Sequence, residues 1–194
     1  MQYLKDTKQV LNHFGKNVIS KARNNLTRKD IRDKGTLYNS LKYTYQEKGG
    51  DLIVNFDLGR YGWFIDQGVQ GANPNIITLW TAKASKQTGV QKAPLSPFRF
   101  KGKYPPSEPL AEWAKRKNIR LRDDKGRFKK GNYKAIGFVL SKFIYAQGIK
   151  PTYFFSNPYN AANKKLPTEV RQAFVKDLIH QIKEEHKNRY KKKR

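Results

Sequence analysis

Residues 42–57, KYTYQEKGGDLIVNFD, are the stretch that decides the fold. Polar and apolar side chains alternate on both sides of Gly49-Gly50, as they do in paired strands with one buried face. Two adjacent glycines readily adopt the positive φ angles of a tight turn. The stretch therefore predicts an antiparallel β-hairpin. One face of it carries Tyr43 and Tyr45 in the first strand and Leu52, Val54 and Phe56 in the second.

Before the hairpin, residues 4–26 predict an amphipathic helix. Its apolar side chains recur mostly at spacings of three, four and seven residues, which place them on one helical face. They are Leu4, Leu11, Phe14, Val18, Ala22 and Leu26. Asp6 near the start and Arg23 near the end suit the helix dipole. Gly35 and Thr36 are then expected to cap a short turn.

After the hairpin comes GRYGWFIDQGVQG, residues 59–71. It predicts a turn into a short helix over about residues 61–67, which Gly68 ends. Tyr61, Trp63, Phe64 and Ile65 are expected to pack as a corner that turns the hairpin into the core. Asp66 is the one acid among them, and it is either a catalytic group or a structural one.

The second half of the chain predicts an extended arm followed by helices. Residues 72–106 have no helical period and are long for a loop in a compact domain. A helix opens at Ser107, and another runs from Tyr133 to Gln147 with Ile136, Val139, Leu140, Phe143 and Ile144 on its buried face. A long helix then carries Leu166, Val170, Phe174, Leu178 and Ile182, with Pro167 as a kink or a restart. Residues 187–194 form a basic tail that is expected to fray.

Charge is the strongest compositional signal. The chain has 41 Lys and Arg residues against 15 Asp and Glu residues, a formal net charge of +26. A small soluble domain usually carries a net charge of about 2–8 in magnitude. An excess of this size is best offset by a polyanion or an acidic partner, so nucleic acid is the first candidate. The alternative is a generally lysine-rich surface that keeps the protein soluble. Apolar residues make up only 37% of the chain, which predicts a thin core completed by neighbouring subunits.

Few residues suit catalysis or metal binding. The chain has no cysteine, which excludes disulfides and thiolate zinc sites. His180 and His186 are six residues apart, which is wrong for one helical face, and His13 has no acidic cluster nearby in the sequence. No phosphate-binding glycine loop or serine-nucleophile turn occurs. We therefore expect no catalytic, metal or cofactor site, and no membrane span, since no apolar run approaches ~18 residues.

A metal-dependent nuclease remains a minor alternative because of the positive charge. Such enzymes bring two or three carboxylates together on Mg²⁺. Asp51, Asp57 and Asp66 are the acids that would have to converge.

The basic residues are the main candidates for contact with DNA or with an acidic protein. They fall in two runs, one after residue 114 and one at the end of the chain: Lys115, Arg116, Lys117, Arg120, Arg122, Arg127, Lys129, Lys130, Lys191, Lys192, Lys193 and Arg194. Contacts of this kind give affinity for phosphates without a choice of base sequence. The plainer interpretation is a solvated face and a solubilising tail.

Three separated motifs resemble the tail-completion, or head–tail joining, proteins of the neck of tailed bacteriophages. In that family the first motif reads Thr-Gly-x-Leu-x-x-Ser-Ile and the second Tyr-x-x-Phe/Val-Glu-x-Gly-Thr, and Pro-Phe-x-x-Pro-Ala comes before the last helix. Here the first is matched by Gly35, Leu37, Ser40 and Leu41, and the second by Tyr61, Phe64 or Ile65, Asp66 and Gly68. Leu41 stands in place of Ile, Asp66 in place of Glu, and Val69 in place of Thr. The third is matched by Phe154, Phe155, Pro158 and Ala161.

The resemblance implies an α+β fold with an N-terminal helix, a small antiparallel sheet with a hairpin and a long C-terminal helix, plus an inserted segment with two helices. Residues 1–71 and 150–190 would form the core domain, and residues 72–149 the insertion. Gly35, Leu37, Ser40, Tyr61, Phe64, Asp66 and Gly68 would then be structural signature residues.

The function implied is structural and not enzymatic. Copies of the chain would form a hexameric or dodecameric ring in the virion, between portal and tail, touching other neck and tail proteins and the packaged DNA. Asp66 would be a local hydrogen-bonding or inter-subunit acid. The alternative function is non-specific nucleic-acid binding without a ring.

Overall fold

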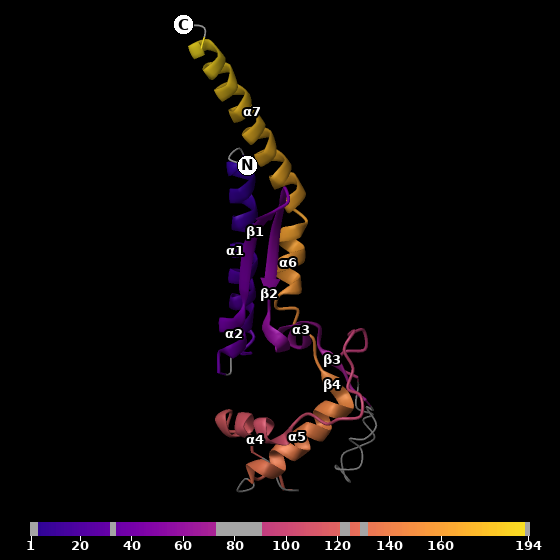
Figure 1. The fold of residues 1–194 in the computed structure, drawn as a ribbon. Helices are drawn as coiled ribbons and strands as arrows, with labels where there is room; N and C mark the ends of the chain where they lie inside the picture. The colour runs from indigo at the N-terminus through magenta and orange to yellow at the C-terminus, as the bar shows by residue number, and fades with distance from the viewer. Residues whose placement is uncertain (1–3, 32–33, 73–90, 121–124, 129–131, 193–194) are drawn as a thin grey trace. The chain divides into compact units, whose positions relative to one another are not determined.

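The computed structural model describes residues 4–31, 34–72, 91–120, 125–128 and 132–192. The chain divides into two compact units (Figure 1). Unit 1 consists of Met1–Arg60 with Phe154–Arg194, and unit 2 is Tyr61–Tyr153. Helices predominate and the strands are few and antiparallel, so the predicted α+β class is confirmed.

Unit 1 is built on the predicted hairpin. Strands β1 (Lys42–Lys48) and β2 (Asp51–Asp57) pair antiparallel, with Lys42 opposite Asp57 and Tyr45 opposite Val54. Gly49 and Gly50 both have positive φ, at 60° and 98°, as the tight turn requires. The hairpin is thus confirmed, with its turn at the glycine pair.

Helix α1 (Lys5–Arg28) packs along this hairpin and also contacts the two C-terminal helices, α6 (Ser156–Asn163) and α7 (Leu166–Lys192). Val18, Ala22 and Leu26 are almost completely buried on its inner face, as the helical period predicted. Gly15 allows close contact with the hairpin, because a Cβ atom there would enter the ring of Tyr43. The short helix α2 (Thr36–Ser40) follows α1 and leads into β1.

An aromatic cluster joins α1, the hairpin and α6. Phe14, Phe56, Phe155 and Tyr159 have ring centroids 5.4–6.1 Å apart, mostly in edge-to-face geometry. Such pairs add about 0.5–1.5 kcal/mol each beyond their area burial. Phe154 beside them is fully buried. The core of unit 1 is therefore closed by residues from both ends of the chain.

The long C-terminal helix is present as predicted, and most of the large apolar residues that it carries are exposed. Helix α6 ends at Asn163 and α7 begins at Leu166, so Pro167 marks a restart. Ala173 and Asp177 are the buried residues of α7, whereas Phe174, Leu178 and Ile182 are 43%, 40% and 65% exposed. The small Ala173 and the hydrogen-bonded Asp177 face α1 and turn the large apolar side chains outward. The helix also continues through Lys192. The expectation that the basic tail frays is therefore wrong for residues 187–192.

Unit 2 contains the two predicted helices, α4 (Ser107–Arg116) and α5 (Tyr133–Gln147), which pack closely on each other. A Cβ atom at Gly137 of α5 would overlap the carbonyl oxygen of Ser107, so glycine permits the close approach. Ile136 is buried as predicted, but Phe143 is 36% exposed and Ser141 is buried instead. The helix contact lies on the small residues of α5 and not on its largest ones. Most of the predicted arm, residues 73–90, lies outside the described residues.

Residues 61–71 belong to unit 2, although the sequence placed them in the first domain. Helix α3 (Gly59–Gln67) leads from β2 into unit 2, where β3 (Val69–Gln70) pairs antiparallel with β4 (Gly148–Ile149). The backbone N–H of Thr152 also donates to the carbonyl oxygen of Ile65 at 3.2 Å. These hydrogen bonds tie the stretch to residues 148–152 and so to unit 2.

Candidate functional site

Asp66 is a structural residue of unit 2. Its side chain is completely buried, and its Oδ2 accepts a hydrogen bond from Nε2 of Gln67 at 2.7 Å. Its backbone carbonyl accepts from the N–H groups of Thr152 at 3.1 Å and Tyr153 at 2.9 Å. A carboxylate with no exposed surface cannot meet an outside substrate as it stands, so the local hydrogen-bonding role is the one the geometry supports.

The aromatic residues around Asp66 do not form the expected packing corner. Tyr61 is 75% exposed, Trp63 is 46% exposed and Phe64 is 38% exposed. Phe64 nevertheless meets Phe98 edge to face, with ring centroids 4.6 Å apart. The expectation failed because small residues, Gly62, Gly68 and Val69, occupy the buried positions of this stretch.

The signature residues of unit 1 shape the connection from α1 to the hairpin. Gly35 precedes α2 with a φ of 77°, in the left-handed region that favours glycine. The hydroxyl of Ser40 donates to the carbonyl oxygen of Leu37 at 2.9 Å, and Leu41 next to it is fully buried. Arg23 of α1 donates to the carbonyl oxygens of Tyr38 at 3.2 Å and Leu41 at 2.8 Å. These contacts hold the turn against α1 and are structural.

Of the three acids required for a nuclease, the two on unit 1 do not come together. Asp51 and Asp57 lie at opposite ends of β2 and are exposed, while Asp66 is buried in unit 2. Oδ1 of Asp57 accepts from the N–H of Gly59 at 2.8 Å, which is a turn contact. Across the part of the chain that the structure describes, no three His, Asp or Glu residues are grouped closely enough to hold a metal ion.

The first basic run is partly described and lies on unit 2. Lys115, Arg116, Lys117, Arg120 and Arg127 are all exposed. Arg116 lies 4.0 Å from Glu112 on α4, and Arg120 donates to Oδ1 of Asn118 at 3.1 Å. Lys115 and Arg116 occupy the last turn of α4, where basic side chains also suit the helix dipole. The arrangement can hold phosphates or carboxylates by charge.

The remaining candidates fall largely outside the described residues. Arg122, Lys129, Lys130, Lys193 and Arg194 have no described position, and Lys191 and Lys192 are described only as the end of α7. The interpretation of these residues as phosphate contacts stays a prediction.

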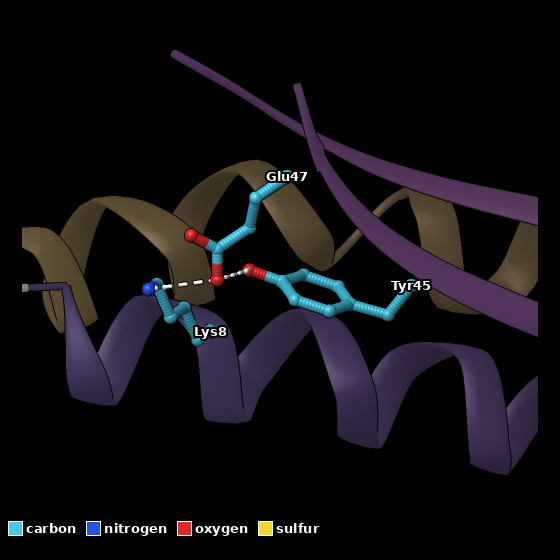
Figure 2. A network of polar contacts seen from close by, with 3 residues as sticks. All are labelled: Lys8, Tyr45 and Glu47. Atoms are coloured by element: carbon cyan, nitrogen blue, oxygen red, sulfur yellow. Dashed lines mark hydrogen bonds and ion pairs between the residues drawn. The ribbon is translucent and has the colours of Figure 1, made fainter. Parts of the chain in front are cut away.

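Sequence reasoning missed a polar network between α1 and the hairpin (Figure 2). Nζ of Lys8 lies 2.7 Å from Oε1 of Glu47, and the hydroxyl of Tyr45 donates to the same oxygen at 3.4 Å. The hydrogen bond from Lys8 holds the pKa of Glu47 below its usual range. Partial burial and the charge of Glu47 raise the pKa of Tyr45. The alternation of Tyr45 and Glu47 on one face of β1 was the available signal.

Sequence reasoning also missed the role of Asp177, a buried acid of α7. Its two carboxylate oxygens accept hydrogen bonds from the backbone N–H groups of Asp6 and Thr7, each at 2.9 Å. The hydroxyl of Thr7 donates to Oδ2 as well, at 2.8 Å. Burial opposes the charged form, but these hydrogen bonds and the nearby His180 hold the pKa of Asp177 below its usual range. No local sequence pattern links residues so far apart.

No protein-family model, no curated protein and no solved structure matches this chain. Within the described residues, no helix has both the length and the apolar character needed to cross a membrane.

Proposed function

We propose that the protein is a structural subunit of the neck of a tailed-phage virion, where copies assemble into a ring around the DNA channel between portal and tail. One observation carries the proposal. The motif-bearing segments occur in the order of the tail-completion family, and each coincides with a matching element: α2 before the hairpin, α3 after it, and α6 before the long C-terminal helix.

The charge of the chain supports this placement. A ring that lines a DNA conduit benefits from a positive surface that attracts phosphates without reading bases. The net charge is +26, and the described residues of the basic run on unit 2 are exposed. The same feature favours the second candidate, a nucleic-acid-binding protein that works without a ring.

Exposed apolar side chains support a subunit that is completed by neighbours. Tyr61 and Trp63 on α3 and several large side chains on α7 are 40% exposed or more. Large apolar patches on a protein surface usually mark contacts with other proteins. A subunit of an assembly therefore explains them better than a solitary DNA-binding domain does.

Negative-stain microscopy and light scattering of the purified chain, alone and with portal, neck and tail proteins, test the proposal. Hexameric or dodecameric rings with a central channel are the expected result. A matched pair of variants sharpens the test: Trp63→Ser alters an exposed aromatic on α3, and Lys48→Ser alters an exposed lysine at the hairpin turn. Ring formation should weaken in the first variant and persist in the second.

A chain that binds DNA but forms no ring with any of these partners would overturn the neck assignment in favour of the second candidate. Mg²⁺-dependent nicking of DNA that disappears in Asp66→Asn, with the fold retained by circular dichroism, would instead support a nuclease.

A further inference from the structure

Helix α7 carries an uncovered apolar surface, the α7 stripe, on the side away from α1. The stripe consists of Phe174, Val175, Leu178, Ile179 and Ile182, with exposed fractions of 43%, 48%, 40%, 45% and 65%. Their spacing places them on adjacent rows of one helical face. The residues that pack inward, Ala173 and Asp177, lie on a different face. Large apolar side chains gathered in this way generally mark a contact surface.

The charge around the stripe identifies what can cover it. Between Val170 and His186 there are three basic residues, Arg171, Lys176 and Lys183, and three acidic residues: Glu184 and Glu185, which are exposed, and Asp177, which is buried against α1. This segment therefore has no formal net charge, in a chain whose total is +26. Two copies of the chain repel each other over most of their surface, but they can approach along this segment without that cost.

The distribution of the charges also fixes the direction of the approach. Arg171 lies seven residues before Leu178 and Glu185 lies seven residues after it, so both are near the line of the stripe. Each is displaced from Leu178 by about 10 Å along the axis. If two α7 helices meet antiparallel at Leu178, Arg171 of one copy comes opposite Glu185 of the other, twice in the pair. A parallel pair would instead oppose like charges.

The apolar residues have the same symmetry. Phe174 lies four residues before Leu178 and Ile182 lies four residues after it. In the antiparallel arrangement, each Phe174 therefore meets an Ile182 on either side of the central Leu178 pair. Rows of side chains spaced by four residues are the ridges that commonly interlock between packed helices.

We propose that two copies of this chain associate through their α7 stripes, antiparallel and around a two-fold axis at Leu178. The contact is isologous, with the same surface used on both copies. It goes beyond the proposed ring, because a ring is closed by heterologous contacts between different surfaces, and neither contact requires the other. The surface is small, so the dimer is weak and depends on concentration.

Disulfide trapping tests the geometry, and the chain suits it because it has no cysteine of its own. Leu178→Cys should form a covalent dimer under mild oxidation, since residues at the two-fold axis come within disulfide range. Phe174→Cys mixed with Ile182→Cys should give a mixed dimer, while each variant alone should give little. Self-linking of Phe174→Cys alone, at the level of Leu178→Cys, would indicate a parallel pair and overturn the proposal.

Charge reversal tests the pairing in solution by sedimentation equilibrium. Arg171→Glu and Glu185→Arg should each weaken the dimer roughly tenfold, because each opposes like charges at two places. The double variant restores opposite signs and should dimerise nearly as well as the parent chain. Lys187→Glu is the control: it changes the net charge as Arg171→Glu does, but it lies nine residues after Leu178, on the opposite side of the helix.

All of these side chains are exposed, so unchanged thermal unfolding should accompany each variant and rule out misfolding as the cause. A parent chain that stays monomeric at every concentration, with no Leu178→Cys disulfide, would overturn the dimer and leave the ring proposal untouched. A double variant as weak as the single ones would also overturn it.

Discussion

At the scale of single residues, Asp177 connects two helices that are far apart in the sequence. Helix α1 has no side-chain cap of its own, because Leu4 precedes it. The first N–H groups of a helix lack partners inside the helix, and a carboxylate there also complements the helix dipole. Asp177 supplies this cap from α7, 170 residues away from Thr7 along the chain. One side chain thus joins the first helix of the chain to the last.

We expect Asp177→Asn to lower the free energy of unfolding by about 1–3 kcal/mol, because an amide NH₂ group would face N–H donors and leave a buried polar group unsatisfied. Chemical denaturation monitored by circular dichroism measures this. Glu184→Gln, at an exposed acid of the same helix whose Oε1 lies 3.3 Å from Nζ of Lys187, is the control and should cost less than about 0.5 kcal/mol. Equal effects of the two substitutions would contradict the capping role.

The stability contributed by Asp177 should also depend on pH. Its pKa is lower in the folded chain than in the unfolded chain, where a value of about 3.9 is usual. The contribution is therefore fully present above that value and is lost as pH falls through the folded pKa. The gap in stability between the parent chain and Asp177→Asn should be constant near neutral pH and shrink below about pH 4. A gap that widens toward acid would contradict the assignment.

In unit 2, a close backbone contact depends on a single residue, Gly68. Its φ is 73°, and a Cβ atom would overlap the carbonyl oxygen of Ile149. Gly102 has a similar φ of 68° but no atom within 4 Å of a Cβ position. Gly102→Ala should therefore lower the free energy of unfolding only by the cost of placing alanine in the left-handed region, about 1–2 kcal/mol. Gly68→Ala should lower it by about 1–3 kcal/mol more, because its Cβ atom is also crowded. Thermal unfolding of the two variants measures the difference, and equal losses would show that crowding at Gly68 is relieved.

At the scale of elements, sequence patterns located the helices and strands better than they oriented them. The bounds of α5 and the pairing of the hairpin could be read from periodicity and glycine positions. The orientation of α7 could not, because its inner face is chosen by Asp177 binding the start of α1 and by the small Ala173. Hydrophobic periodicity identifies an apolar face but not whether that face meets the same chain or another one.

For residues 59–71, too, the sequence predicted the helix but not which side chains are buried. The sequence led correctly to a short helix ending at Gly68, and Asp66 on it is buried and hydrogen-bonded to Gln67. The exposure of Tyr61 and Trp63 was not predictable, because several buried positions are filled by glycines, which have no hydrophobic signal. Close backbone approach in unit 2 is a tertiary property that composition does not encode.

The contact between α1 and β1 gives a prediction at this scale (Figure 2). Burial raises the pKa of Tyr45, and the charge of Glu47 raises it further. In Glu47→Gln the pKa of Tyr45 should fall but stay above its ordinary value, because the burial remains. NMR titration of the tyrosine ring carbons measures it, with Glu185→Gln as a control on another element. A pKa of Tyr45 that does not move would mean that Tyr45 and Glu47 do not interact in solution.

At the scale of the whole molecule, the charge is unevenly distributed. The segment around the α7 stripe is neutral, while the basic run on unit 2 has a local excess of positive side chains. A neutral apolar surface suits contact between copies, and a basic surface suits contact with a polyanion. The two kinds of contact therefore need not compete for the same residues.

The proposed function, together with the exposed basic run on unit 2, predicts how the protein would respond to DNA and salt. Affinity should be independent of base sequence and should fall steeply with salt, since each phosphate contact releases counterions. Lys115→Glu combined with Lys117→Glu should reduce the slope of log affinity against log salt by about 1.8, from two lost phosphate contacts at ~0.9 each. Fluorescence anisotropy with duplexes of unrelated sequence measures both the affinity and its dependence on salt.

Lys164→Glu with Lys165→Glu makes the same change in net charge at exposed residues between α6 and α7 and is the control. If the two double variants lose affinity equally, total charge and not the basic run on unit 2 governs binding. If only the first loses it, the run is the DNA-facing surface, and DNA binding uses residues other than those of the α7 stripe.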